Sequence, residues 1–194
     1  DNTKEELIAA MGQCEQTQGQ SVLDHGKSVE SYLFDIVNHL RDGKPLTHEW
    51  KIPDWVYEHK DLLLSSLPDD ETLSLYTKYH DCGKPFCVEV DENGRKHFPN
   101  HAEVSYKTFT HFFENNAAAE LIRCDMDIHT LKSDGVDEFC KNPHCLTLLL
   151  SGLAEIHSNS RMFGGMDSTS FKIKWKAITQ RGKQIIKTKQ YENK

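Results

Sequence analysis

The chain has 194 residues, of which 37% are hydrophobic and 27% are charged, and its formal net charge at pH 7 is −7. This size and composition predict a single globular domain over residues 1–194 with a hydrophobic core. The acidic net charge argues against broad, non-specific binding of nucleic acid, although a local basic patch stays compatible with it.

The sequence also lacks the features of membrane and secreted proteins. No apolar run is long enough to span a membrane, and the segment 1–13 has neither the charge nor the apolar core of a signal peptide. The six cysteines form no C-x-x-C pair, and their spacings match neither a zinc finger nor a small disulfide framework. We therefore expect reduced thiols, a cytoplasmic location and no membrane partner.

The hydrophobic pattern is mostly helical. Apolar residues at helical spacing predict a helix from Val22 to Leu40, with His25 on its apolar face. A second helix is expected over about 54–67, and a third from Asp69 or Asp70 into a pair of chemically active residues, His80-Asp81. Further helices are expected over about 100–115, 117–129 and 143–158.

Turn signals separate these helices. The sequence Gly83-Lys84-Pro85 stops the third helix directly after the His-Asp pair. The sequence Glu92-Asn93-Gly94 predicts a small β-hairpin between segments 86–90 and 95–98. Asn100 and Glu103 are spaced like a capping box at the start of the next helix. The basic C-terminal segment, about 168–194, alternates in polarity over 171–175, which favours a short strand or a fraying amphipathic end.

The stretch 78–105 concentrates side chains with metal-binding chemistry. Imidazole and carboxylate are natural ligands of divalent transition metals, and a helix end lets His80 and Asp81 converge more readily than a helix interior does. His25 is the best candidate for a third ligand, because a histidine on an apolar face needs a hydrogen bond or a metal. A hydrogen-bonded core histidine at position 25 is the alternative. Lys84 is either a contact to a phosphate oxygen or a solvated turn lysine.

The order of these residues resembles the HD phosphohydrolase superfamily. The matching positions are His25, the turn His80-Asp81-x-Gly83-Lys84-Pro85, the hairpin sequence from Asp91 to Arg95, His97-Phe98 and His101. More narrowly, the pattern is similar to the HD domain of bacterial tRNA CCA-adding enzymes and poly(A) polymerases. The similarity is dense from Tyr79 to Ser105 and extends from Ser21 to about Ser160.

The resemblance implies an all-α HD-domain helical bundle with a small β-hairpin and a core at about 20–160. It also implies a divalent metal, left open among Mn, Mg, Co, Ni and Fe, with one ion or two. The residues that match metal-ligand positions, or stand where the family has a ligand, are His25, His80, Asp81, His101, Asp125, His129 and Glu155. His157 and Asp167 are alternatives to Glu155 as the last ligand.

The implied activity is metal-dependent hydrolysis of a phosphate ester, with Asp81 and Lys84 as the catalytic residues. Further candidates for binding the substrate phosphate, or else solvated surface charges, are Arg95, Arg123 and Arg161. RNA ends with 2′,3′-cyclic or terminal phosphates are one substrate class, and free nucleotides or a cyclic-nucleotide signal are another. A degenerate HD domain that binds a nucleotide or a partner without catalysis is the alternative of a different class.

Overall fold

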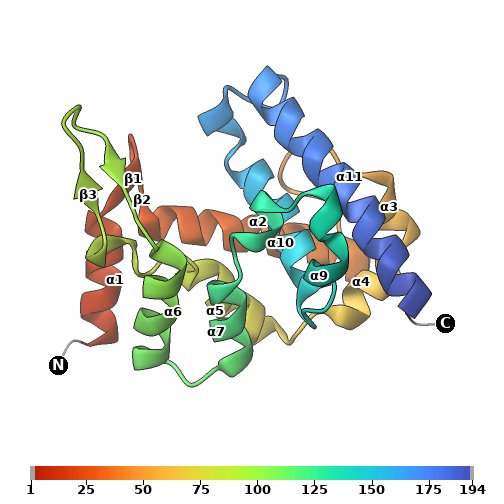
Figure 1. Cartoon of the computed structure of the whole chain (residues 1–194), viewed down its shortest axis with the longest axis horizontal. Helices are drawn as coiled ribbons and strands as arrows, with labels where there is room; N and C mark the ends of the chain where they lie inside the picture. Colours follow the sequence, from red (N-terminus) through yellow and green to blue (C-terminus); the bar gives the residue numbers. More distant parts are fainter. Residues whose placement is uncertain (1–2, 193–194) are drawn as a thin grey trace. The chain divides into compact units, whose positions relative to one another are not determined.

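The computed structural model describes residues 3–192, and they are mainly helical (Figure 1). This confirms the predicted all-α class with a small hairpin. The described residues form two compact units, one made of the residues up to Glu30 with Asp69–Asp125, the other of Ser31–Pro68 with the residues from Met126 on. The prediction of a single domain stays a prediction, because compact units need not fold independently.

The first unit holds the predicted chemistry. Its elements are α1 (Lys4–Gln13), β1 (Glu15–Thr17), β2 (Gln20–Ser21), the start of α2 (Val22–Asp42), α5 (Asp70–Tyr79), η1 (Lys84–Phe86), β3 (Glu89–Val90), β4 (Lys96–His97), α6 (His101–Phe112) and α7 (Asn116–Arg123). The strands form two antiparallel hairpins, and β3–β4 pairs Glu89 with His97 as the Asn-Gly turn predicted. Leu7 and Met11 of α1 are buried, so the packing includes residues before the predicted core.

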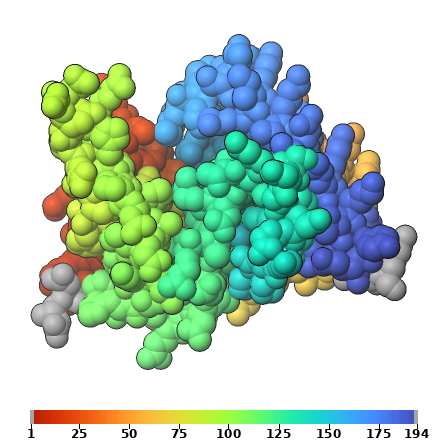
Figure 2. All heavy atoms as spheres, in the orientation of Figure 1, coloured from red at the N-terminus to blue at the C-terminus, as the bar shows by residue number. Residues whose placement is uncertain are grey.

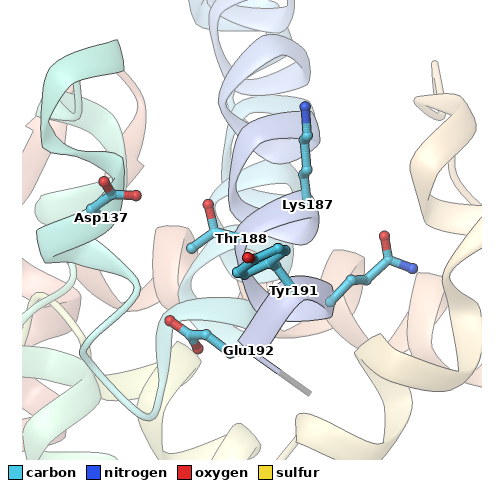
Figure 3. A pocket seen from close by; sticks show the side chains of 6 residues that line it. Asp137, Lys187, Thr188, Tyr191 and Glu192 are labelled. Atoms are coloured by element: carbon cyan, nitrogen blue, oxygen red, sulfur yellow. The ribbon is translucent and has the colours of Figure 1, made fainter. Parts of the chain in front are cut away.

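The second unit is built around a helix that is apolar on most sides. Its elements are the rest of α2, α3 (Asp54–Glu58), α4 (Lys60–Ser66), α8 (Asp127–Thr130), η2 (Ser133–Gly135), α9 (Val136–Phe139), α10 (Cys145–Ser158), η3 (Ser160–Phe163) and α11 (Thr169–Glu192). Leucines 146, 148, 149, 150 and 153 of α10 are buried, and α4, α8 and α11 pack on this helix. A surface hollow of about 550 Å³ lies between α9 and the end of α11 (Figure 3).

Asp35 fixes the polar connection that follows α2. Its carboxylate accepts hydrogen bonds from the backbone N–H and the hydroxyl of Thr47, from the backbone N–H of His48 and from the indole of Trp50, at 2.8 to 3.0 Å. Partial burial alone would raise the pKa of Asp35, but these donors outweigh it and hold the pKa below its ordinary value. The connection is therefore ordered by one carboxylate.

Three helix predictions were wrong in detail. The helix expected over 54–67 is two helices, because the backbone at His59 leaves helical geometry (φ −120°, ψ 30°). The helix expected over 117–129 ends at Arg123 and restarts at Asp127. The capping box at Asn100 is absent, because Asn100 adopts a left-handed conformation (φ 56°) and its side chain caps nothing in the described residues.

The C-terminal segment is a helix, not a strand. Phe171, Ile178 and Ile185 of α11 recur at intervals of seven residues and are buried against the second unit. The indole of Trp55 on α3 donates to the backbone carbonyl of Thr179, at 3.0 Å. Side chains of α11 (blue) form a long stretch of the surface of this unit (Figure 2). No helix among residues 3–192 is both long and apolar enough to cross a membrane.

Candidate metal centre

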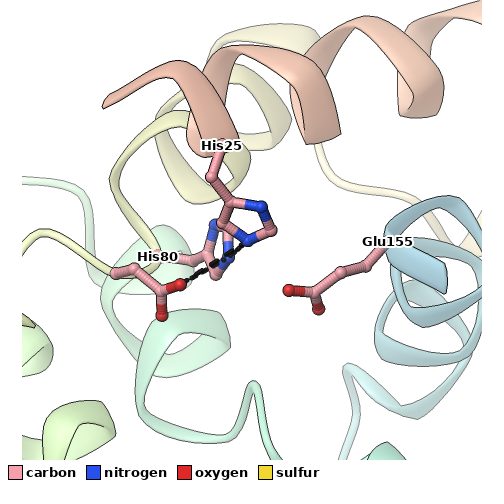
Figure 4. Close-up of side chains that lie close together, drawn as sticks. His25, His80 and Glu155 are labelled. Carbon is pink, nitrogen blue, oxygen red and sulfur yellow. Dashed lines mark hydrogen bonds and ion pairs between the residues drawn. The ribbon is translucent and has the colours of Figure 1, made fainter. Parts of the chain in front are cut away.

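Two histidines and an aspartate converge in the first unit. His25 comes from α2 and His80 is the C-cap of α5 (Figure 4). Asp81 is the next residue in the chain. The Nε2 atoms of His25 and His80 are 3.1 Å apart, and Asp81 Oδ2 lies 3.6 Å from the first and 3.3 Å from the second. All three residues are buried, and we call them the trio.

These separations match those of atoms that bind one metal ion. Two ligands that each lie about 2.1 Å from an ion are about 3.0 Å apart at a right angle and about 3.4 Å apart at a tetrahedral angle. The three observed separations run from 3.1 to 3.6 Å. The group can therefore hold a divalent ion with little rearrangement.

The tautomer of His80 also suits metal binding. Its Nδ1 lies 2.6 Å from the backbone carbonyl oxygen of Thr77, which can only accept a hydrogen bond. Nδ1 therefore carries a proton, and Nε2 is the ring nitrogen directed at His25 and Asp81, where it can ligate a metal when it is unprotonated. A backbone acceptor behind a ligating imidazole is the usual way that proteins fix its orientation.

The end of α5 makes neighbouring residues converge. After Tyr79 the backbone continues in tight turns, with Cys82 N donating to Tyr79 O and Lys84 N donating to Asp81 O, at 2.9 and 3.0 Å. Consecutive side chains diverge along a regular helix, but His80 and Asp81 lie beyond the last helical residue, and Asp81 Oδ2 comes within 3.3 Å of His80 Nε2. The predicted position of the pair at a helix end is confirmed.

Gly26 lets α2 reach α5. A Cβ atom at this position would lie 2.2 Å from the backbone carbonyl oxygen of Lys78, far inside van der Waals contact. The residue before this glycine is His25, and the residue two positions after Lys78 is His80. The missing side chain therefore allows the helix contact that places the two imidazoles side by side.

Gly83 has the same role toward α6. A Cβ atom there would lie 2.4 Å from the backbone nitrogen of Ser105, and the Gly83 N–H donates to the Ser105 hydroxyl at 2.9 Å. The neighbouring thiol of Cys82 lies 3.4 Å from the Ser105 carbonyl oxygen. The turn after Asp81 is thus fastened to the helix that begins with His101.

Asp81 carries the negative charge of the group. Burial alone would raise the pKa of its carboxyl, but the nearby charges of His80 and Lys84 outweigh burial and hold the pKa well below its usual range. Lys84 Nζ lies 3.1 Å from Asp81 Oδ2. The same ammonium donates to Gln16 Oε1 at 3.2 Å and lies over the ring of Phe98. Lys84 is therefore held at the edge of the trio rather than solvated in a turn.

Two further predicted ligands belong to the same unit. His101 Nε2 lies 3.8 Å from Asp81 Oδ1, and its Nδ1 is 3.3 Å from the carbonyl oxygen of Phe98. Asp125 is buried, and its carboxylate accepts a hydrogen bond from the Tyr76 hydroxyl. His101 thus lies near Oδ1 of Asp81, whereas the imidazoles of His25 and His80 lie near Oδ2.

The remaining predicted ligands belong to the second unit. His129 Nε2 lies 3.0 Å from Glu155 Oε2, an acceptor on α10 (Figure 4 labels Glu155). That Glu155 ligates a metal stays a prediction. His157 is excluded as a ligand, because its Nδ1 donates to Leu153 O at 2.8 Å and its Nε2 accepts from Lys51 N at 3.0 Å. Asp167 follows η3 in a turn.

The three arginines proposed to bind phosphate differ in their surroundings. The guanidinium of Arg123 stacks on Tyr106 at 3.7 Å and pairs with Glu103 at 3.4 Å, so other groups already hold it. Arg95 lies in the exposed β3–β4 turn, and Arg161 lies exposed in η3. Their role in phosphate binding stays a prediction.

Sequence reasoning missed Gln16, Thr77 and Gly26, because no local pattern marks them as neighbours of the trio.

His157 predicts a pH-dependent contribution to stability. Burial holds the pKa of His157 below its ordinary value, and the Lys51 N–H requires an unprotonated Nε2. Its contribution is therefore full above about pH 6.5 and declines as the pH falls toward the lower folded-state pKa, by at most about 1.4 kcal/mol per pH unit. We expect His157→Gln to flatten the pH dependence of the unfolding free energy below pH 6.5 relative to the unsubstituted protein.

Denaturant unfolding at a series of pH values measures this effect. His111→Gln, a change at an exposed histidine, is the matched control and should leave the pH dependence as it is. Equal slopes for the unsubstituted protein and His157→Gln would contradict a neutral, buried His157.

Comparison of the chain with protein-family models, with curated proteins and with solved structures found no match. The interpretation of the trio as a metal site therefore rests on its geometry.

Proposed function

We propose that this protein is a metal-dependent phosphohydrolase of the HD superfamily, acting on phosphate esters of RNA ends or nucleotides. The observation that carries the proposal is the convergence of His25 Nε2, His80 Nε2 and Asp81 Oδ2 at ligand-to-ligand distances. An ordinary buried ion pair would account for the contact between Asp81 and Lys84. It would not account for two imidazole nitrogens that lie close to the same carboxylate oxygen.

The donor set suits a divalent transition metal such as Mn, Co, Ni or Fe, and Mg to a lesser degree. Two imidazole nitrogens and one carboxylate oxygen suit borderline metals, whereas Mg²⁺ favours an all-oxygen ligand set. Such an ion supplies Lewis-acid activation of a water molecule and of a phosphoryl oxygen. His101, on the other oxygen of Asp81, is the candidate ligand for a second ion.

The chain's own residues supply orientation and charge. Asp81 holds one oxygen at the trio and directs the other toward His101, so it can orient a nucleophile between them. Lys84 Nζ lies 3.1 Å from Asp81 Oδ2, the carboxylate oxygen near the two imidazoles, and is the cation placed to meet a phosphate oxygen. A charge-assisted hydrogen bond from Lys84 would offset the charge that builds up on phosphorus-bound oxygens.

The test is phosphate release from nucleotides, 2′,3′-cyclic nucleotides and 3′-phosphorylated RNA, with Mg²⁺, Mn²⁺, Co²⁺ and Ni²⁺ in turn. We expect turnover with at least one metal and substrate, and loss of turnover by a factor of about a thousand or more in Asp81→Ala, because that change removes a ligand. Metal content measured on the same samples should fall with activity.

Two results would contradict the proposal. Turnover that survives in Asp81→Ala would place the chemistry elsewhere. Metal binding to the trio without turnover on any substrate would favour a degenerate HD domain that binds a nucleotide or a partner, and ligands that raise the melting temperature would then be the next search.

A further inference from the structure

Helix α11 concentrates positive charge in an acidic protein. It contains seven lysine and arginine residues and one acidic residue, Glu192, which gives it a charge of +6 in a chain of net charge −7. Four of its lysines, 172, 176, 183 and 187, are separated by four, seven and four residues, so they share one face of the helix. We call these four residues the lysine stripe.

The lysine stripe lies opposite to the buried face of α11. Phe171, Ile178 and Ile185 are buried in the second unit, whereas all four stripe lysines are exposed. At 1.5 Å per residue the stripe runs for about 22 Å. It is therefore an extended row of ammonium groups on a rigid support.

The stripe lysines lack the contacts that hold the other cations of the helix, among which Lys174 lies over the ring of Phe163. Lys189 pairs with Glu192 at 3.0 Å, and Arg181 donates to Leu131 O at 3.4 Å and to Gln184 at 3.0 Å. Within residues 3–192, no carboxylate forms an ion pair with any of the four stripe lysines. A row of cations without carboxylate partners raises the local concentration of a polyanion.

An exposed aromatic ring extends the stripe at one end. Tyr191 is 82% exposed and lies one helical turn after Lys187. Both residues, together with Gln190, line the hollow of about 550 Å³. Asp137 lies on the opposite side of the hollow, and the side chain of Lys187 extends away from it (Figure 3). A ring beside a row of cations is the combination that binds a base and its phosphates in a single strand.

We propose that the lysine stripe and Tyr191 form a binding site for single-stranded nucleic acid. Four phosphates would meet the four ammonium groups, and one base would stack on Tyr191. A lipid surface fits this helix less well, because interfacial helices need a continuous free apolar face, whereas Phe171, Ile178, Ile185 and Ile186 of α11 are buried in the protein and Ile173 is exposed. The site lies on α11 alone and does not depend on the proposed hydrolysis.

Fluorescence anisotropy with labelled single-stranded RNA and DNA, in chelator and without divalent metal, tests this site separately from catalysis. Four phosphate contacts predict that the logarithm of the binding constant falls with the logarithm of salt concentration with a slope of about −2.8. Each single Lys→Gln change in the stripe should reduce the slope by about 0.7, and the fourfold variant should abolish it. Tyr191→Ala should weaken binding about tenfold, whereas Tyr191→Phe, which keeps the ring, should not.

The matched control replaces four exposed lysines outside α11, Lys27, Lys60, Lys107 and Lys132, by glutamine, which changes the net charge by the same amount. It should retain most of the binding. Equal loss in the control and the stripe variant, or a slope unchanged in the stripe variant, would overturn the site. Tighter binding to duplex DNA or to phosphatidylserine vesicles than to single strands would overturn the assignment of its occupant.

Discussion

Replacing Gly26 by alanine is expected to destabilise the protein by about 3 kcal/mol and to weaken metal binding at least about tenfold. The added methyl group would meet the Lys78 carbonyl oxygen at 2.2 Å; the position of a Cβ atom is fixed by its own backbone and the carbonyl belongs to a helix, so neither can rotate away. The start of α2 must then move away from α5. Because His25 and His80 flank this contact, the same movement separates their Nε2 atoms and spoils the ligand geometry.

Gly12→Ala is the control for helix propensity. Gly12 also lies in a helix, but a Cβ atom there would meet Leu23 Cδ2 at 3.7 Å, an ordinary contact. Alanine is favoured over glycine in helices, so Gly12→Ala should be neutral or stabilise by up to about 1 kcal/mol. Denaturant unfolding and calorimetric titration with Mn²⁺ measure both effects. A Gly26→Ala protein with normal stability and normal metal affinity would show that α2 and α5 do not approach each other here.

Local signals gave the position of the His-Asp pair and marked His25 as a candidate third ligand, but they did not show the helix contact that brings the three residues together. Gly83 and Pro85 mark a chain reversal after Asp81 in any context, and the Asn93-Gly94 turn sets a hairpin within a few residues. The approach of His25 to His80 joins residues 55 positions apart. It depends on the missing side chain of Gly26, and a glycine inside a helix gives no local signal of what packs against it.

The errors in the helices have a related cause. The polarity of 171–175 alternates, but the residues buried on α11 recur at intervals of seven, and that period is visible only over more than two turns. At Asn100 and Glu103 the spacing of a capping box was right, yet Glu103 pairs with Arg123 of the neighbouring helix instead. In both cases, contacts with distant parts of the chain outweighed the local sequence pattern.

Lys84→Met is expected to separate metal binding from turnover. The ammonium of Lys84 lies 3.1 Å from the Asp81 oxygen that faces the trio, so an incoming cation has to compete with it. Without that charge, affinity for Mn²⁺ should rise about tenfold. Turnover should nevertheless fall about a hundredfold at saturating metal, because the phosphate loses its cation. Inorganic phosphate should also inhibit the variant more weakly.

The Lys84→Met change should also lower the stability of the protein, which is measured independently of turnover. Removing one partner of a buried ion pair leaves the other charge uncompensated, which costs about 3 kcal/mol or more. A divalent metal replaces the missing positive charge, so it should raise the melting temperature of Lys84→Met more than that of the unsubstituted protein. Lys84→Arg keeps the charge, so it should show neither the gain in metal affinity nor the larger rise in melting temperature. If metal affinity and turnover both fell in Lys84→Met, the lysine would act only by positioning Asp81, and the phosphate contact would have to come from another residue.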